Sequence, residues 1–283
     1  MTKKELIIGD EYIMSLIKKG ALDESNAKSI TNSLFAEAKK NNEIELLAFE
    51  YLVEEIIFDV NSFPKFPNLR HLILECSFKN FDFLENFPKL ECFNIRNHNE
   101  PTKKLNIAKP IKNLKEILFF CNYDVWKLFL KNYKLFPNIE IFTFVGFEAF
   151  AEEYVAEEYL HTDDLLYFPK LKKIKLQDAL FYEQTTRSMC NKHWLEEGEE
   201  YRPLKCMDKL SKLKYLEEID YLLLENINNL KKFKNLKKIT KFECLEPEEN
   251  VDGWFEDTSI LDKILDKATS HLDIKDKSFF SID

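Results

Sequence analysis

The stretch FPNLRHLIL, residues 66–74, decides the fold because the chain repeats it. Close copies run over residues 87–95, 136–144 and 168–176, and looser copies over residues 111–119 and 233–241. Each copy has apolar residues at the spacing L-x-x-L-x-L, which places the last two on one face of a β-strand and the residues between them on the other. The chain is therefore predicted to be a repeat protein.

The first apolar residue of each copy serves as an anchor for counting. The anchors are Val53, Leu69, Leu90, Leu114, Ile139, Leu171, Leu216 and Leu236. Their spacing scatters around the roughly 20 to 29 residues of a leucine-rich repeat. With this pattern the chain resembles the leucine-rich repeat family over about residues 50 to 245.

The resemblance implies an α/β fold: a leucine-rich repeat solenoid with a curved parallel sheet on its concave face and helices and irregular turns on its convex face. The longer family motif places Asn or Cys at the ninth position, where the side chain caps the backbone of the turn. The ninth residue here is Asn61, Asn122 or Cys244 in three copies. The other copies have Ser77, His98, Phe147, Ala179 and Leu224. The predicted ladder is therefore irregular.

Caps are expected at both ends, because a terminal repeat exposes the edge of the core. Residues 1–50 are predicted to form a helical N-terminal cap, since apolar residues from Ile13 onward recur at helical spacing. The solenoid is expected over residues 51–245, and residues 246–283 are expected to form a C-terminal capping segment with a helix over 258–272.

Short helices are predicted on the convex side between strands. Asp124 is placed to cap a helix that carries Val125 and Phe129, and Asn80 precedes a shorter turn that begins at Phe81. The chain has 25 phenylalanines, which are expected to fill the core where the convex segments are irregular. With 45% hydrophobic residues over 283 positions, it can bury one continuous core.

Composition limits the location and the partners. The charged residues near Met1 interrupt any secretory signal, and no apolar run is long enough to span a membrane. The six cysteines have no disulfide or metal spacing, which favours reduced thiols and a cytoplasmic location. A net charge of -9 argues against a nucleic-acid binder and favours solubility or a basic partner.

The third, fifth and seventh residues from each anchor are predicted to face solvent on the concave side, and this count includes Leu222 and Phe242. Parallel strands stack about 4.8 Å apart, so equal positions form lanes. Apolar residues of the central copies would form one patch: Ile73, Leu118, Phe120, Ile141 and Val145. Its charged rim would be Glu75, Arg96, Glu116, Lys173 and Lys175. Such a patch is typical of an interaction site, unless an insertion or a terminal segment covers it.

Two connections are longer than a convex turn requires and are predicted to be insertions, at 148–167 and 184–208. The first is an acidic helical pattern that includes Glu152, Glu153, Glu157 and Glu158. The second is a polar loop with Trp194. Insertions in a repeat array often build a binding face, and neutral loop drift is the alternative.

The sequence offers little for catalysis or metal binding. Its few glycines form no phosphate-binding loop. His71, Cys92 and Glu116 would lie in one lane, but nothing nearby indicates an oxyanion hole. Cys190, His193 and Cys206 could supply three zinc ligands, but a fourth is missing, so buried thiols and a loop histidine are preferred. We expect no enzyme activity, no cofactor and no metal.

These observations lead us to expect a non-catalytic protein that engages a protein partner through its concave face and acidic insertions, with a monomer as the default state. For small acidic proteins of this kind, the resemblance suggests adaptors, enzyme inhibitors, or immunity and antitoxin proteins. The acidic insertions would suit a basic toxin enzyme such as a nuclease. The alternatives are a secreted effector or signalling regulator that uses the same surface, and an enzyme with its site in the insertions.

Overall fold

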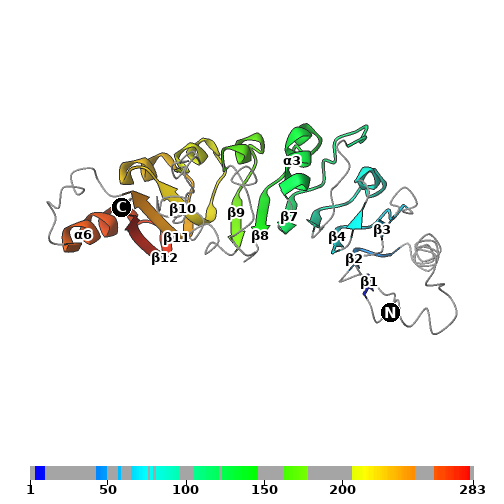
Figure 1. Cartoon of the computed structure of the whole chain (residues 1–283), viewed down its shortest axis with the longest axis horizontal. Coiled ribbons are helices and arrows are strands. Elements are labelled where there is room, and N and C mark those ends of the chain that lie inside the picture. The colour runs from blue at the N-terminus through cyan, green and yellow to red at the C-terminus, as the bar shows by residue number, and fades with distance from the viewer. Residues whose placement is uncertain are drawn as a thin grey trace, which may run out of the picture. The chain divides into compact units, whose positions relative to one another are not determined.

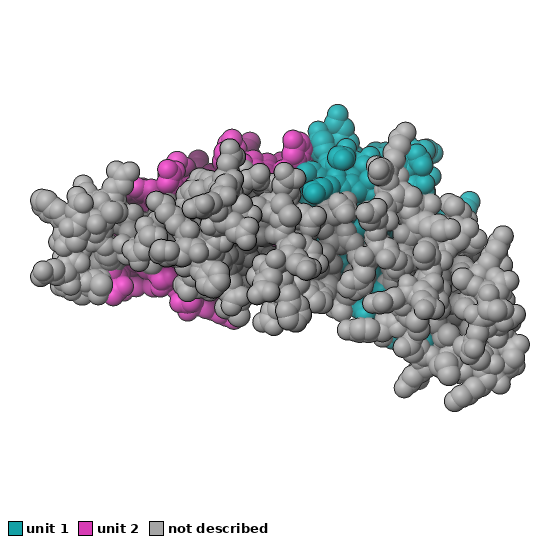
Figure 2. Space-filling model, in the orientation of Figure 1, with its two compact units in different colours: residues 1–140 teal, residues 141–283 magenta. Residues whose placement is uncertain are grey.

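A computed structural model of the chain describes residues 4–9, 43–49, 57–58, 65–75, 77–78, 81–95, 105–120, 123–145, 162–177, 206–245 and 258–280. The chain divides into two compact units, Met1–Glu140 and Ile141–Asp283, which Figure 2 colours separately. Each unit contains parallel strands that follow one another in space in the order in which they occur in the chain (Figure 1).

The main strands of the first unit are β1 (Glu5–Ile8), β2 (Leu46–Phe49), β4 (His71–Leu74), β6 (Cys92–Ile95) and β7 (Glu116–Phe120). Each neighbouring pair in this series is parallel. Two further strands, β3 (Ile57–Phe58) and β5 (Ser77–Phe78), pair with each other in a separate small sheet. Short segments connect the strands: η2 (Asp82–Asn86), α3 (Tyr123–Lys131) and η3 (Tyr133–Leu135).

The strands of the second unit are β8 (Ile141–Val145), β9 (Lys173–Gln177), β10 (Glu218–Leu224), β11 (Lys238–Leu245) and β12 (Asp273–Phe280). They are also parallel to their neighbours. Their connections are η5 (Thr162–Tyr167), η7 (Asp208–Lys212), η8 (Ile227–Lys232) and α6 (Thr258–Thr269). The segments η5, η7, η8 and α6 pack on one another in that order.

The repeated phrase places the strands correctly. From Leu69 to Leu236, every predicted anchor is followed two residues later by the first residue of a parallel strand. The anchor and the two apolar residues after it are buried in the first unit, as Leu69, Leu72 and Leu74 illustrate. The prediction of an α/β fold with a repeat-like parallel sheet is therefore confirmed.

The anchor at Val53 is wrong. The neighbour of β4 is β2, with Leu46 opposite His71, so the residue equivalent to Leu69 is the buried Ile44. The spacing L-x-x-L-x-L fits both the segment that begins at Ile44 and the one that begins at Val53. The first segment provides the strand of the main sheet, whereas the second contains β3, which pairs elsewhere.

The two predicted caps also need correction. The N-terminal segment 1–50 contains the strands β1 and β2, so the helical spacing of the run that begins at Ile44 does not form a helix over Leu46–Phe49. The two earlier predicted helices lie in residues 10–42, outside the described residues. The helix predicted over 258–272 is present as α6. The sheet does not end before it, however, because β12 follows and pairs with β11 through seven residue pairs.

The short helix predicted at Asp124 is present as α3, and it begins one residue earlier, so Asp124 lies in its first turn. This helix inserts Phe129 into the centre of an aromatic cluster. The Phe129 ring stacks on Phe136 with centroids 4.6 Å apart and meets Phe119 edge-on at 5.2 Å. Phe81 and Phe93 lie at 6.0 Å. This cluster accounts for part of the high phenylalanine content.

Charge alternates along the residues that immediately precede the strands. The series is Lys4, Glu45, Arg70, Glu91, Lys115 and Glu140 in the first unit, and Lys172, Glu217 and Lys237 in the second. Main-chain hydrogen bonds join successive members within each unit, for example from the Glu91 amide to the Arg70 carbonyl at 2.8 Å. Ion pairs join Lys4 to Glu45, Arg70 to Glu91 and Lys237 to Glu217. Each exposed pair is weak, but together they favour one pairing of the strands.

Asparagine side chains add a second link between repeats. The Nδ2 atoms of Asn113, Asn138 and Asn235 donate hydrogen bonds to the main-chain carbonyls of Pro88, Lys112 and Lys214. Each asparagine directly precedes an anchor, so these bonds hold the turns before neighbouring strands together. The ninth-position Cys244 is buried, whereas Asn61 and Asn122 lie outside the described residues.

Candidate binding surface

The first unit brings several of the predicted lane residues together. The strand register places Ile73 opposite Asn94 and Asn94 opposite Leu118, on β4, β6 and β7. All three side chains are half-buried. We name these three residues the Asn94 row. Adjacent side chains on parallel strands are about 4.8 Å apart, so the row is a continuous strip of contact area.

The middle of this row has an unsatisfied polar atom. The side-chain oxygen Oδ1 of Asn94 is buried and has no hydrogen-bond partner among the residues that the structure describes. A buried acceptor without a donor costs about 1 to 3 kcal/mol relative to a satisfied one. This atom is closed to solvent, so the row offers a partner the exposed parts of Ile73 and Leu118 rather than the Asn94 oxygen.

A second row runs beside the first on the same strands. The register aligns His71 with Cys92 and Cys92 with Glu116. The His71 side chain is exposed, and the other two are half-buried. Glu75 is half-buried at the end of β4. The predicted rim residue Arg96 lies outside the described residues, and the same holds for the side chain of Phe120.

The second unit holds the remaining predicted patch residues, and not all of them are on the surface. Ile141 is half-buried, whereas Val145 is buried, with 7% of its surface exposed. Thr143, which lies between them on β8, is also buried. Val145 is therefore not an exposed member of a patch in this structure.

Charged residues dominate the neighbouring lanes of the second unit. Lys173 Nζ lies 2.8 Å from Glu218 Oε1, and this hydrogen bond lowers the pKa of Glu218 below its usual value. Lys175 is half-buried on the same strand. The hydroxyl of Thr240 donates to Asp220 at 3.2 Å. This part of the face is polar and internally paired, in contrast to the Asn94 row.

The prediction that Leu222 and Phe242 face solvent is wrong, because both are fully buried. The alternation of exposed and buried residues ends in β10, where every residue from Tyr221 to Leu224 is buried. The Tyr221 hydroxyl donates to Glu243 at 2.7 Å, and Lys241 lies 3.2 Å from the same carboxylate. Nothing in the apolar pattern indicated this buried polar group.

The predicted insertion residues Glu152, Glu153, Glu157, Glu158 and Trp194 lie outside the described residues. The end of the first insertion is described as η5, which is a 3-10 helix. There Asp163 pairs with Lys209 on η7 at 2.6 Å. Cys190 and His193 also lie outside the described residues, so the possible zinc ligand set is described only at Cys206.

The thiols of Cys206 and Cys244 both have raised pKa values. Burial, followed by the nearby Asp208 carboxylate, raises the pKa of the Cys206 thiol to about 12. Burial and the proximity of Cys206 raise the pKa of Cys244 to about 12. These thiols are protonated at neutral pH, so they are poor nucleophiles and poor metal ligands.

The described residues contain neither a metal-ligand cluster nor a membrane-spanning helix. They contain no cluster of three or more His, Cys, Asp and Glu side chains that could hold a metal ion. Among the same residues, no helix combines the length and apolar character needed to cross a membrane.

Sequence reasoning missed one surface that the structure assembles. The short pattern Lys-x-Lys occurs at Lys212 and Lys214 and again at Lys232 and Lys234, in equivalent turns of neighbouring repeats. Aligning these two copies on their anchors would have revealed it. No protein-family model matches the chain, and no curated protein matches its sequence. The functional argument therefore depends on the arrangement of these side chains.

Proposed function

We propose that the chain is a non-catalytic leucine-rich repeat protein that binds a protein partner through the outward side chains of its parallel strands. The observation that carries the proposal is the Asn94 row, in which the half-buried apolar side chains of Ile73 and Leu118 flank Asn94 on adjacent strands. Partly exposed apolar side chains beside polar ones are typical of an interaction site.

The row has the composition of an interface centre. Its apolar members, Ile73 and Leu118, are half-buried and would lose their remaining exposed area on binding. The neighbouring Cys92 and Glu116 are half-buried and add polar contacts at its edge. Interfaces gain most of their free energy from such central contacts surrounded by polar residues.

A binding role is preferred to catalysis at His71, Cys92 and Glu116 for a geometric reason. A catalytic thiol requires nearby amide groups that are free to stabilise an oxyanion. The Cys92 and Glu116 amides instead donate to the carbonyls of Arg70 and Glu91 at 2.9 and 3.0 Å. Sheet formation therefore occupies the main-chain amides of Cys92 and Glu116 themselves.

The cytoplasm is the proposed location. Cys206 and Cys244 are free thiols in the described structure, and Cys206 is close enough to help raise the pKa of Cys244. A reducing compartment keeps such neighbouring cysteines as thiols. A basic partner is proposed on account of the net charge of -9, which would accelerate association by long-range attraction.

The experiment has two stages. The first identifies a partner by cross-linking to the intact chain followed by mass spectrometry, and the partner is then purified. The second measures its affinity for the Ile73→Asp and Leu118→Asp variants by calorimetry. Ile264→Asp is the matched control, because Ile264 is an exposed apolar residue on α6 in the other unit.

We expect each substitution in the Asn94 row to weaken binding by about a hundredfold, the size of a hot-spot loss of roughly 2 to 3 kcal/mol. The Ile264→Asp variant should bind as the wild type does. Circular dichroism melting must show that all three variants remain folded. Unchanged affinity of a folded Leu118→Asp variant would refute the proposal.

A further inference from the structure

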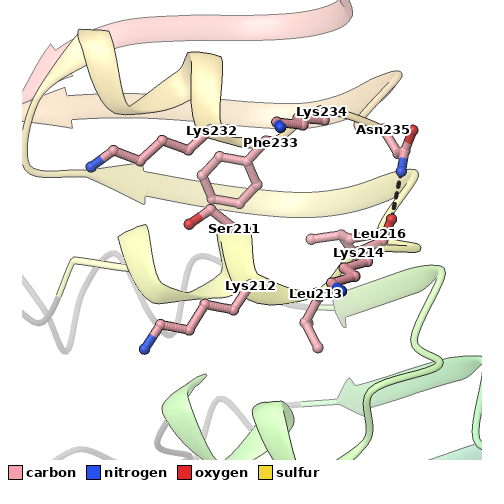
Figure 3. Close-up of a pocket in the computed structure, with 9 residues that line it drawn as sticks. All are labelled: Ser211, Lys212, Leu213, Lys214, Leu216, Lys232, Phe233, Lys234 and Asn235. Atoms are coloured by element: carbon pink, nitrogen blue, oxygen red, sulfur yellow. Dashed lines mark hydrogen bonds between the residues drawn. The ribbon is translucent and has the colours of Figure 1, made fainter.

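A groove of about 390 Å³ lies between two neighbouring turns of the second unit. One wall comes from the end of η7 and the turn after it, and the other from the end of η8 and the turn after it (Figure 3). Four of its lining residues are lysines, namely Lys212, Lys214, Lys232 and Lys234. We name this site the lysine groove. It is separate from the Asn94 row, which belongs to the first unit.

The four lysines occupy equivalent positions in two adjacent repeats. Lys212 and Lys232 are the last residues of η7 and η8. Lys214 and Lys234 begin the turns that follow. Figure 3 shows the Lys212 and Lys232 side chains extending in the same direction. Like charges at equivalent positions of neighbouring repeats repel each other.

The same two repeats avoid this repulsion only a few residues later. There the register places Glu218 opposite Lys238, and Glu217 pairs with Lys237 at 3.1 Å. At the start of β10 and β11, residues of opposite charge therefore stand opposite each other. In the groove, by contrast, lysines occupy the equivalent positions of both turns. This break in the charge pattern concentrates positive charge in the groove, which favours the binding of an external anion.

Within the described part of the chain, no ion pair joins any of the four groove ammonium groups to a carboxylate. Other lysines nearby are paired, as Lys209 is with Asp163. The carboxylate of Asp208, on η7, is occupied by the Asn229 side-chain amide at 2.6 Å and the Glu225 amide at 3.1 Å. Although the chain has a net charge of -9, these four ammonium groups line one groove without a carboxylate partner among the described residues.

The groove is formed before any ligand arrives. The side-chain amide of Asn235 donates to the Lys214 carbonyl at 2.5 Å and so fixes the two turns to each other (Figure 3). The buried side chains of Leu213 and Phe233 give the groove an apolar base. A volume of this size is typical of a site for a small molecule rather than for a folded macromolecule.

We propose that the lysine groove binds the linked phosphoryl groups of a small diphosphate. The four lysines stand on two adjacent turns, and their long flexible side chains allow two pairs of ammonium groups to contact two linked phosphoryl groups. Lysine is a common phosphate ligand, because its ammonium group acts as a compact point charge. The apolar base would also accept an attached organic group.

Calorimetric titration at low ionic strength tests this proposal with three probes: pyrophosphate, adenosine diphosphate and inorganic phosphate. We expect pyrophosphate to bind more tightly than phosphate, because it can contact both lysine pairs. The double variant Lys212→Gln/Lys232→Gln should bind pyrophosphate at least about tenfold more weakly, which corresponds to the loss of charge-assisted hydrogen bonds. Tighter binding of adenosine diphosphate than of pyrophosphate would identify a nucleotide as the ligand class.

The matched control is Lys127→Gln/Lys131→Gln, which removes the same charge from exposed positions on α3. Equal weakening by both double variants would refute a specific groove, as would equal affinity of the wild type for phosphate and pyrophosphate. Tighter binding of a poly-glutamate peptide than of pyrophosphate would also overturn the proposal in favour of a polypeptide ligand. These outcomes do not depend on the protein partner of the Asn94 row.

Stability provides a readout without any ligand. Removal of one of two repelling lysines should raise the melting temperature of the Lys232→Gln variant at low salt, whereas Lys237→Gln should lower it, because Lys237 is paired with Glu217. A decrease for Lys232→Gln would show that the groove lysines do not repel one another, and would remove the electrostatic basis of the proposal.

Discussion

The side-chain amide of Asn138 donates a hydrogen bond to the main-chain carbonyl of Lys112, 2.7 Å away in the preceding repeat. Equivalent bonds at Asn113 and Asn235 show that this link recurs in other turns. It joins turns rather than strands, so it contributes to repeat stacking independently of the sheet.

Substitution of this asparagine should destabilise the chain modestly. We expect Asn138→Ala to lower the free energy of unfolding by about 1 kcal/mol, the usual net contribution of one such hydrogen bond. Urea denaturation measures the change. Lys112→Ala is the control, because the acceptor is a main-chain atom that this substitution retains. An equal loss in both variants would contradict the assigned role of the bond.

Phe129 should be among the most sensitive core positions. Its ring contacts Phe81, Phe93, Phe119 and Phe136, and it is fully buried. We expect Phe129→Ala to cost about 3 to 5 kcal/mol, since it leaves a cavity and removes the aromatic contacts. Lys127→Ala, at an exposed position on the same helix, should change stability by less than about 0.5 kcal/mol. Thermal melting distinguishes the two, and a tolerated Phe129→Ala would contradict the packing described.

The ion pair between Lys173 and Glu218 should make stability depend on acidity. The pKa of Glu218 is lowered by the hydrogen bond from Lys173. Because the folded pKa lies below the unfolded value, the stabilisation is complete above the ordinary pKa of 4.5 and is lost as the pH falls through the folded pKa. Glu218→Gln should therefore lower the free energy of unfolding by about 0.5 kcal/mol at neutral pH. It should have almost no effect at a pH at which the Glu218 carboxyl is protonated in both the folded and the unfolded chain.

Denaturation curves at neutral pH and at about pH 3, below the usual carboxyl range, provide that measurement. Glu5→Gln serves as the control for general charge effects, because Glu5 is exposed on β1. If the cost of Glu218→Gln is the same at both pH values, the pair is not responsible for it.

Cys206 and Cys244 should resist alkylation. With pKa values raised to about 12, their thiolate fraction at pH 8 is roughly a thousandfold below that of an ordinary cysteine. Iodoacetamide labelling followed by peptide mass spectrometry should show slow modification of both in the folded chain and rapid modification in guanidinium chloride. Rapid labelling of the folded protein at either position would show that its thiol is accessible and ionised.

The acidic insertion should accelerate association with a basic partner. Reversal of charge at Glu152, Glu153, Glu157 and Glu158 should lower the association rate constant at low salt by about tenfold or more and have little effect at high salt. Stopped-flow measurements with the purified partner test this. The control reverses four exposed acidic residues elsewhere: Glu5, Glu225, Asp262 and Asp273. If both sets of charge reversals lower the association rate constant equally, the effect comes from the net charge alone and not from the insertion.

The sequence predicted most strands because the apolar spacing of each copy specifies both the strand and its buried face. It misled at Ile44, since an apolar residue followed by another three positions later occurs in helices as well as in this phrase. It missed β12 for the opposite reason: His271 stands where an apolar anchor was required, and only pairing with β11 defines the strand.

The candidate binding surface was less predictable than the fold. Lane positions followed from strand alternation, and the register places Ile73, Asn94 and Leu118 side by side as counted. Burial of Val145, Leu222 and Phe242 depends on what packs against each strand, which the alternation of one strand does not specify. The lysine groove depends on two turns being adjacent, and this became evident only from the pairing of β10 with β11.

The alternation of sign along the residues that precede the strands restricts how such a chain can grow by gene duplication. Tandem copying of a single repeat would place two residues of equal charge next to each other, for example a second glutamate beside Glu91. Copying two consecutive repeats together preserves the order of positive and negative charges at every junction. The smallest segment that can be duplicated without an electrostatic penalty is therefore a pair of repeats, and lineages that lengthen this array should gain strands in even numbers.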